Sequence, residues 1–175
     1  MRIPIKHLSF IFFFFSLLYL GALPQSHADI QSSLRGTWKS GCINLGSNIF
    51  IIITSTYDGA GRGSDQVVYY RDPACTSPTG LVKTNSKVSY TIGKEIKLGG
   101  DRNAYEFNVT ILAWQLTQNG SLIKSGTNVP TQFDIIAIKD NKLYNSGLMS
   151  GRQLPSKTPG DRPTTLDLTN FMTRQ

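Results

Sequence analysis

Short runs rich in β-branched and aromatic residues cover most of residues 36–146, and in Ala104–Thr117 they alternate in part with polar ones. This alternation has the two-residue period of a strand whose two faces differ in exposure. Turn signals separate the runs, namely Asp58-Gly59-Ala60-Gly61, Gly93-Lys94, Gly99-Gly100-Asp101, Gln118-Asn119-Gly120 and Asp140-Asn141. The pattern predicts strands over Thr37–Ile43, Asn48–Tyr57, Asp65–Asp72, Lys87–Ile92, Glu95–Leu98, Ala104–Thr117, Ser121–Lys124, Gln132–Lys139 and Lys142–Ser146.

The C-terminal part of the chain has a different pattern. Gly147–Pro163 contains Gly, Ser and Pro without periodicity, which predicts a long loop, and Thr164–Phe171 is predicted to be a short final strand or a turn. No run indicates a helix of ten residues. Short strands joined mostly by hairpins are typical of an all-β fold, either an up-and-down antiparallel barrel or a sandwich.

Residues 1–28 have the pattern of a secretory signal peptide. Arg2 and Lys6 precede an apolar run from Leu8 to Leu23, and small residues stand three positions before and directly before Asp29. An uncleaved membrane anchor is the alternative, but it needs roughly 20 apolar residues, and this run is shorter. We therefore expect a signal peptide over 1–28, a single domain over 29–175, no transmembrane anchor after cleavage, and a secreted or periplasmic location.

Removing the signal peptide changes the composition. The formal charge falls from +7 to +5 because Arg2 and Lys6 are lost, and both histidines, His7 and His27, are removed as well. The commonest general base and the usual partner of a Ser or Cys nucleophile are then absent. The remaining basic residues are spread along the chain without interleaved aromatic stacking positions, so we do not expect nucleic-acid binding.

Cys42 and Cys75 are the only cysteines. Because disulfides persist in exported proteins, we expect the two to form one bridge, worth roughly 3–4 kcal/mol in the chain-entropy model. A metal pair or a catalytic thiol is the alternative. With two thiols and no histidine partner, a closed zinc site is improbable, so we expect no metal and no cofactor.

Three motifs point to a known family. Trp38-Lys39-Ser40-Gly41-Cys42 follows Leu34 and Gly36, the segment from Tyr69 to Thr79 reads YYRDPACTSPT, and Asp161-Arg162-Pro163 lies near the end. A Gly-x-Trp at the entry to the first strand resembles the calycin superfamily. The whole set is similar to the extracellular domain of the Wnt-inhibitor family named for being down-regulated by adenomatosis polyposis coli.

This resemblance implies a lipocalin-like barrel of about eight strands with an apolar ligand cavity. In the calycin pattern, a tryptophan of the first strand closes one end of the barrel under a basic side chain, which implies that role for Trp38 with Arg162 or Arg174. A ligand contact is the alternative for Trp38. The aromatic residues expected to line the cavity, unless they only pack in the core, are Tyr105, Phe107, Trp114 and Phe133.

The sequence therefore predicts an exported, non-catalytic protein that binds an apolar or amphipathic small ligand such as a lipid. The alternative is a module that contacts another envelope or extracellular protein through residues 147–163. An enzymatic alternative would need a cleft in which carboxylates, or Ser and Lys, converge with perturbed pKa values. Nothing in the sequence shows such convergence.

Overall fold

The computed structural model describes residues 27–99, 102–146 and 156–175, and it confirms the all-β, antiparallel barrel. The predicted signal peptide lies outside these residues, apart from His27 and Ala28. The elements are α1 (His27–Leu34), β1 (Gly36–Ser40), β2 (Ile43–Gly46), β3 (Ile49–Tyr57), β4 (Arg62–Tyr70), β5 (Pro78–Leu98), β6 (Arg102–Gln118), β7 (Ser121–Thr127), β8 (Gln132–Lys139), β9 (Lys142–Asn145), the 3₁₀ turn η2 (Pro159–Asp161) and β10 (Phe171–Arg174).

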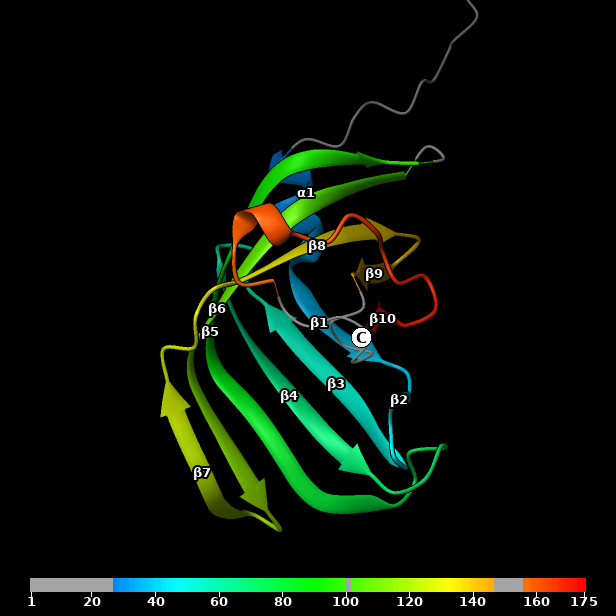
Figure 1. The fold of residues 1–175 in the computed structure, drawn as a ribbon, viewed down its shortest axis with the longest axis vertical. Helices are drawn as coiled ribbons and strands as arrows, with labels where there is room; N and C mark the ends of the chain where they lie inside the picture. The colour runs from blue at the N-terminus through cyan, green and yellow to red at the C-terminus, as the bar shows by residue number, and fades with distance from the viewer. Residues whose placement is uncertain (1–26, 100–101, 147–155) are drawn as a thin grey trace, which may run out of the picture.

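Eight of the described strands close into the barrel. The antiparallel pairings follow the order β1, β10, β9, β8, β6, β5, β4, β3, and β3 then pairs with β1. Strands β3 to β6 are long and form a curved wall, whereas β8, β9 and β10 are short and complete the ring (Figure 1). Because the ring is closed, each of these eight strands pairs with a neighbour on both sides.

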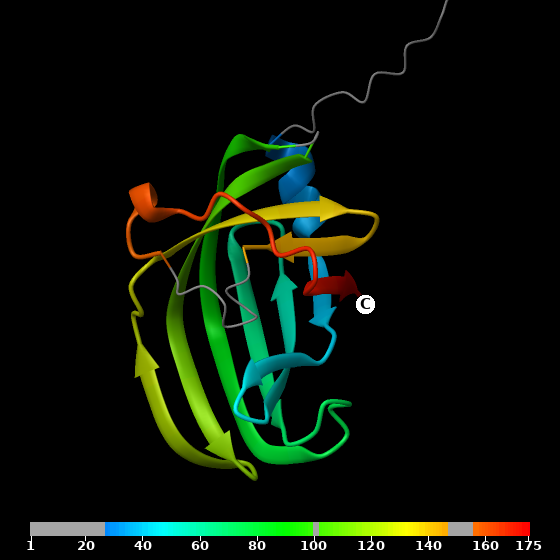
Figure 2. The same ribbon diagram turned by 45° about the vertical axis from the view of Figure 1, so that its right-hand side comes forward.

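Two further strands extend the sheet beyond the ring. The C-terminal half of β6 pairs with β7, while its N-terminal half pairs with β8, so the sheet divides along β6. Strand β2 pairs with the start of β3. Both β7 and β2 lie at the lower end of the molecule, away from α1 (Figures 1 and 2).

Helix α1 covers the upper end of the barrel (Figure 2). Ile30 and Leu34, four residues apart and so on one face of the helix, are fully buried in the core. The predicted cleavage point before Asp29 falls inside this helix. The strand pattern did not indicate α1, because an eight-residue helix of polar and Ser-rich sequence is stabilised by packing rather than by propensity.

The seam between the two ends of the chain is centred on Trp38. In the strand pairing, this fully buried residue lies opposite Arg174 of β10 on one side and Ser55 of β3 on the other. The guanidinium carbon of Arg174 lies 4.6 Å from the centroid of the Trp38 ring, and the indole Nε1 donates a 2.7 Å hydrogen bond to the Leu34 carbonyl. Arg174 also donates hydrogen bonds to the backbone carbonyls of Ser33 and Arg35. These carbonyls, at the C-terminal end of α1, are thereby satisfied.

The predicted hairpin at Gly93-Lys94 is wrong. β5 continues through these residues as one strand, because β6 pairs with it on both sides: Ile92 lies opposite Phe107 and Glu95 opposite Tyr105, with a bulge between. A Cβ at Gly93 would lie 2.3 Å from the Glu106 carboxylate, so the glycine makes room for that side chain. The hairpin between β5 and β6 instead follows Leu98.

Other boundaries also differ from the prediction. The first predicted strand is divided into β1 and β2, and β5 includes residues 78–86, which were not predicted as a strand. The final strand is Phe171–Arg174 rather than Thr164–Phe171, because its pairing partners are Trp38–Ser40 of β1 and Lys142–Tyr144 of β9. Partners so distant in sequence leave no local signal.

The disulfide between Cys42 and Cys75 is confirmed, with a Cα–Cα distance of 5.7 Å. It ties the segment after β1 to the turn that follows β4. In that turn the Asp72 carboxylate accepts hydrogen bonds from the backbone amides of Ala74, Thr76 and Ser77. Asp72 therefore holds the turn that presents Cys75.

Replacing both Cys42 and Cys75 by serine is expected to lower the free energy of unfolding by roughly 3–4 kcal/mol, because the unfolded chain loses its cross-link. Urea denaturation followed by circular dichroism measures the loss. Wild-type protein in excess reductant is the matched control and should unfold at the same urea concentration as the variant. Equal midpoints for the oxidised wild type and the double variant would contradict the prediction.

Replacing Trp38 by alanine should cost about 3–5 kcal/mol of folding free energy, the range for removing a large buried aromatic side chain. Arg174→Met keeps the aliphatic stem but removes the cation–π contact and the hydrogen bonds to α1, so we expect a loss of about 1–3 kcal/mol. The exposed Arg102→Met is the control and should change stability by less than about 0.5 kcal/mol. If Arg174→Met and Arg102→Met change the free energy of unfolding by the same amount, the stability of the seam does not depend on Arg174.

Candidate functional site

A cavity of about 240 Å³ lies inside the barrel. Its walls follow the two-residue period of the strands, so alternate residues of each strand face it. The apolar lining residues are Leu34, Ile53, Val67, Val109, Ile111, Ile136 and Leu143, with Tyr57 and Phe107 as the aromatic members. The polar lining residues are Ser55, Asp65, Lys83, Asn85, Gln132, Asp134 and Asn145.

Asp65 of β4 projects into this cavity from the long wall. Its carboxylate accepts a hydrogen bond from the Ser55 hydroxyl of β3 and a 3.4 Å bond from the Asn85 side-chain nitrogen of β5. Asn85 is 7% exposed, and its Oδ1 has no hydrogen-bond partner among the described residues. The polar wall therefore contains a carboxylate and an unsatisfied carbonyl oxygen side by side.

Asp134 of β8 supplies a second carboxyl group and is 4% exposed. Its Oδ1 accepts hydrogen bonds from the backbone amides of Ile135, at 2.7 Å, and Ser146, at 3.3 Å. Arg162 lies nearby, but it donates to the Asp134 backbone carbonyl rather than to the carboxylate. Within the part of the chain that the structure describes, Asp134 thus enters the cavity without a direct ion pair.

Burial raises the pKa of both Asp65 and Asp134 above the usual value for aspartic acid, because the charged form loses hydration inside the barrel. Hydrogen bonds to each carboxylate, together with Lys83 near Asp65 and Arg162 near Asp134, only partly oppose this effect. The pKa of Tyr57 is also raised, first by burial and then by the charges of Asp65 and Asp134. Both carboxyl groups therefore lie close enough to influence the same phenol.

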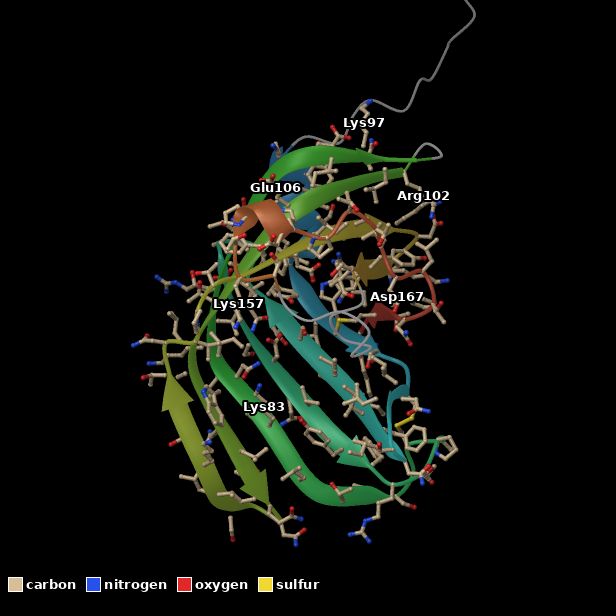
Figure 3. The ribbon with its side chains drawn as sticks, viewed as in Figure 1. Lys83, Lys97, Arg102, Glu106, Lys157 and Asp167 are labelled. Atoms are coloured by element: carbon tan, nitrogen blue, oxygen red, sulfur yellow. A yellow bond between two sulfur atoms is a disulfide. The ribbon has the colours of Figure 1, made fainter. Side chains whose placement is uncertain are left out.

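Lys83 lies on the same face of β5 as Asn85 and also lines the cavity. Its Nζ lies 5.8 Å from the centroid of the Trp114 ring, within the range of a cation–π contact. Figure 3 shows Lys83 in the lower half of the molecule, while Lys97 lies at the upper end of the same strand. The lysines Lys83 and Lys97 are therefore far apart along β5 rather than gathered at one point.

Of the four aromatic residues predicted to line the cavity, the structure places Phe107 there. Its ring contacts Tyr57 and Tyr90, with centroids 6.0 and 5.6 Å apart. Tyr105 is buried in the core, and neither it nor Trp114 lines the cavity. Trp114 instead packs against Gly126 of β7, where a Cβ would lie 2.7 Å from the indole nitrogen.

Phe133 faces away from the cavity. The neighbouring residues Gln132 and Asp134 face inward, so the alternation of β8 directs Phe133 to the opposite face. There the guanidinium carbon of Arg162 lies 5.5 Å from its ring centroid. Arg162 also donates to the Asn108 side chain and forms an ion pair with Glu106 at 3.9 Å.

The barrel-closing residues are thus divided between two places. Arg174 lies on Trp38, as one of the two predicted alternatives, whereas Arg162 lies on Phe133 and fastens residues 156–163 to β6 and β8. Of the loop predicted as a protein contact, residues 147–155 lie outside the described residues. The remainder is held against the barrel by Arg162 and by the bridge from Ser156 to Phe133.

The sequence reasoning did not single out Asp65, Asn85 or Asp134 as site residues. A signal was present for Asp65 and Asp134, since each lies two residues from an apolar residue that faces inward, Val67 and Ile136 respectively. Applying strict alternation to these strands would have predicted that both aspartates face the barrel interior. For Asn85 the bulge in β5 between Asn85 and Val88 hides the register.

Comparison with known protein families found no match, and a search of curated proteins found none either. Within residues 27–99, 102–146 and 156–175, no group of three or more His, Cys, Asp or Glu residues is placed to hold a metal ion. None of the described helices is long and apolar enough to cross a membrane. The site is therefore defined by its own geometry: an internal cavity, mostly apolar, with two carboxyl groups and an unsatisfied amide.

The raised pKa of Asp65 makes stability depend on pH. In the folded protein Asp65 keeps its proton to a higher pH than in the unfolded chain. The stability that this proton contributes is fully present below the unfolded pKa, and it is lost as the pH rises through the folded pKa. Asp65→Asn keeps the shape without the charge. We expect this variant to be more stable than the wild type at about pH 8, and the difference to vanish near pH 3.

Thermal unfolding across this pH range measures the effect. Asp140→Asn is the matched control, because Asp140 is exposed in the turn between β8 and β9, where its φ of 51° suits asparagine. It should leave the pH profile unchanged. If Asp65→Asn differs from the wild type by the same free energy of unfolding at about pH 8 and pH 3, the ionised Asp65 carboxylate does not destabilise the fold.

Proposed function

We propose that this protein is an exported, non-catalytic binding protein that holds a small amphipathic ligand, such as a single-chain lipid, in the barrel cavity. The cavity carries the proposal: it has an apolar wall for a hydrocarbon group and polar side chains for a head group. At about 240 Å³ it is slightly smaller than the roughly 300–1,000 Å³ of common ligand pockets, which favours one short chain over a bulky molecule.

Two further observations support this proposal. The Cys42–Cys75 disulfide fits an exported protein, because such bridges persist in oxidising compartments. The sequence motifs around Trp38 and Cys75 resemble a family in which a lipocalin-like barrel binds lipid. Together they favour ligand binding outside the cytoplasm.

Binding is favoured over catalysis by how the cavity groups are held. The Ser55 side chain is only 1% exposed and interacts with both Asp65 and Tyr57, so it is buried among the polar groups of the wall. Asp134 is fixed by two backbone amides. Groups held in this way are suited to orient a ligand.

A matched pair of variants tests the cavity directly. Val67 lines the cavity, whereas its neighbour Val68 is not among the lining residues and faces the other side of β4. Val67→Trp should fill the cavity and weaken binding of the neutral fluorophore N-phenyl-1-naphthylamine by about tenfold or more, while Val68→Trp should change it less than about twofold. Fluorescence titration with competition by decanol measures both.

Circular dichroism spectra should show that both tryptophan variants are folded. If the wild type binds neither the fluorophore nor decanol, the proposed function is wrong. If Val67→Trp binds as well as Val68→Trp, the ligand site is not this cavity.

A further inference from the structure

We propose that the polar end of the cavity binds a primary ammonium group, so that the preferred ligand is an alkylamine-type amphiphile rather than a fatty acid. The site is the wall formed by Asp65 of β4 and Asn85 of β5, with Asp134 of β8 nearby. This inference rests on the proposed function and adds to it the chemical class of the ligand.

One acceptor in this wall, the Asn85 Oδ1, lacks a hydrogen-bond donor among the described residues. While Asp65 is ionised it accepts from the Asn85 side-chain nitrogen, and this orientation turns the Asn85 Oδ1 away from the carboxylate. That oxygen is buried and has no partner among residues 27–99, 102–146 and 156–175. An unsatisfied buried acceptor is costly, and the group that would satisfy it is an N–H or O–H donor.

An ammonium group matches this requirement better than the other common head groups. It has three N–H donors and no acceptor, so one can reach Asp65 and another the Asn85 Oδ1. A carboxylate or phosphate would bring only acceptors to an oxygen that already lacks a donor. A hydroxyl could donate once but would leave the charge of Asp65 without compensation.

The balance of charge in the cavity leads to the same ligand. Within the part of the chain that the structure describes, its charged lining residues are Asp65, Asp134 and Lys83, two acids against one base. The Lys83 ammonium lies over the Trp114 ring and makes a cation–π contact with it. This contact competes with the attraction between Lys83 and the carboxylates. One bound cation would make the positive and negative charges of the lining equal in number. An anion would instead be repelled by two carboxylates.

The apolar lining accommodates the rest of such a ligand. Val67 lies two residues along β4 from Asp65, and Val109 and Ile111 face the cavity from β6. An alkyl chain attached to the ammonium group can therefore follow the barrel wall while its charged end stays at Asp65. The Lys83 side chain is the one competing feature, because it would recognise an anionic head group if it left the Trp114 ring.

The raised pKa of Asp65 adds a testable dependence on pH. The titratable groups that face Asp65 are Tyr57 from β3, Lys83 from β5 and Asp134 from β8. As the pH falls through the pKa of Asp65, its carboxyl group becomes neutral and loses the attraction for an ammonium ion. An alkylamine stays protonated up to about pH 10, so its affinity should rise with pH and then level off, and binding should release protons.

Three ligands with the same ten-carbon chain separate these possibilities: decylamine, decanol and sodium decanoate. Each competes with N-phenyl-1-naphthylamine on the wild-type protein at about pH 8. We expect decylamine to bind about tenfold more tightly than decanoate. Asp65→Asn should weaken decylamine by about tenfold and decanol by less than about threefold, and Asp140→Asn should change neither.

Lys83→Met provides the opposite test. It should leave decylamine binding unchanged or make it tighter, because a competing positive charge is removed. If decanoate binds most tightly and Lys83→Met abolishes that preference, the head group is anionic and the inference is overturned. Equal affinity for all three ligands would also overturn it while leaving the proposed function intact, whereas no binding of any of them would refute the proposed function itself.

Discussion

The contact between Trp38 and Arg174 is the constraint on which the rest of the structure depends, because it joins the two ends of the chain. Arg174 lies over the Trp38 ring and donates to the carbonyls that end α1, while the Trp38 indole donates to Leu34. One contact therefore closes the ring of strands and fixes the helix that covers its upper end. Without it, β1 and β10 would present free edges.

A closed ring makes an interior, and the interior changes the chemistry of the side chains directed into it. Asp65 and Asp134 would be ordinary solvated acids on an open sheet. Inside the barrel they lose hydration, their pKa values rise, and the Asn85 Oδ1 lies without a partner. Buried polar groups that weaken packing in this way are typical of functional sites.

Much of the fold could be predicted because its signals are local. The residue pattern and turn signals indicated β3, β4, β6, β8 and β9 and an all-β fold, whereas the barrel was what the family resemblance implied. The only two cysteines form the expected bridge. The errors arose where a distant partner overrides the local pattern. Gly93-Lys94 has turn chemistry, yet pairing with β6 on both sides keeps β5 continuous, and Phe133 is aromatic yet faces outward because Asp134 faces in.

The sequence by itself determined the all-β class of fold and the one possible disulfide, because residue period and cysteine count can be read without a structure. The role of Trp38 at the barrel seam came from the family resemblance. Only the tertiary structure decided that Arg174 rather than Arg162 lies on Trp38, and that Asp65, Asn85 and Asp134 face one cavity. These residues come from three strands, and their proximity depends on register and bulges. Register is set by pairing across the whole ring, so no single segment encodes it.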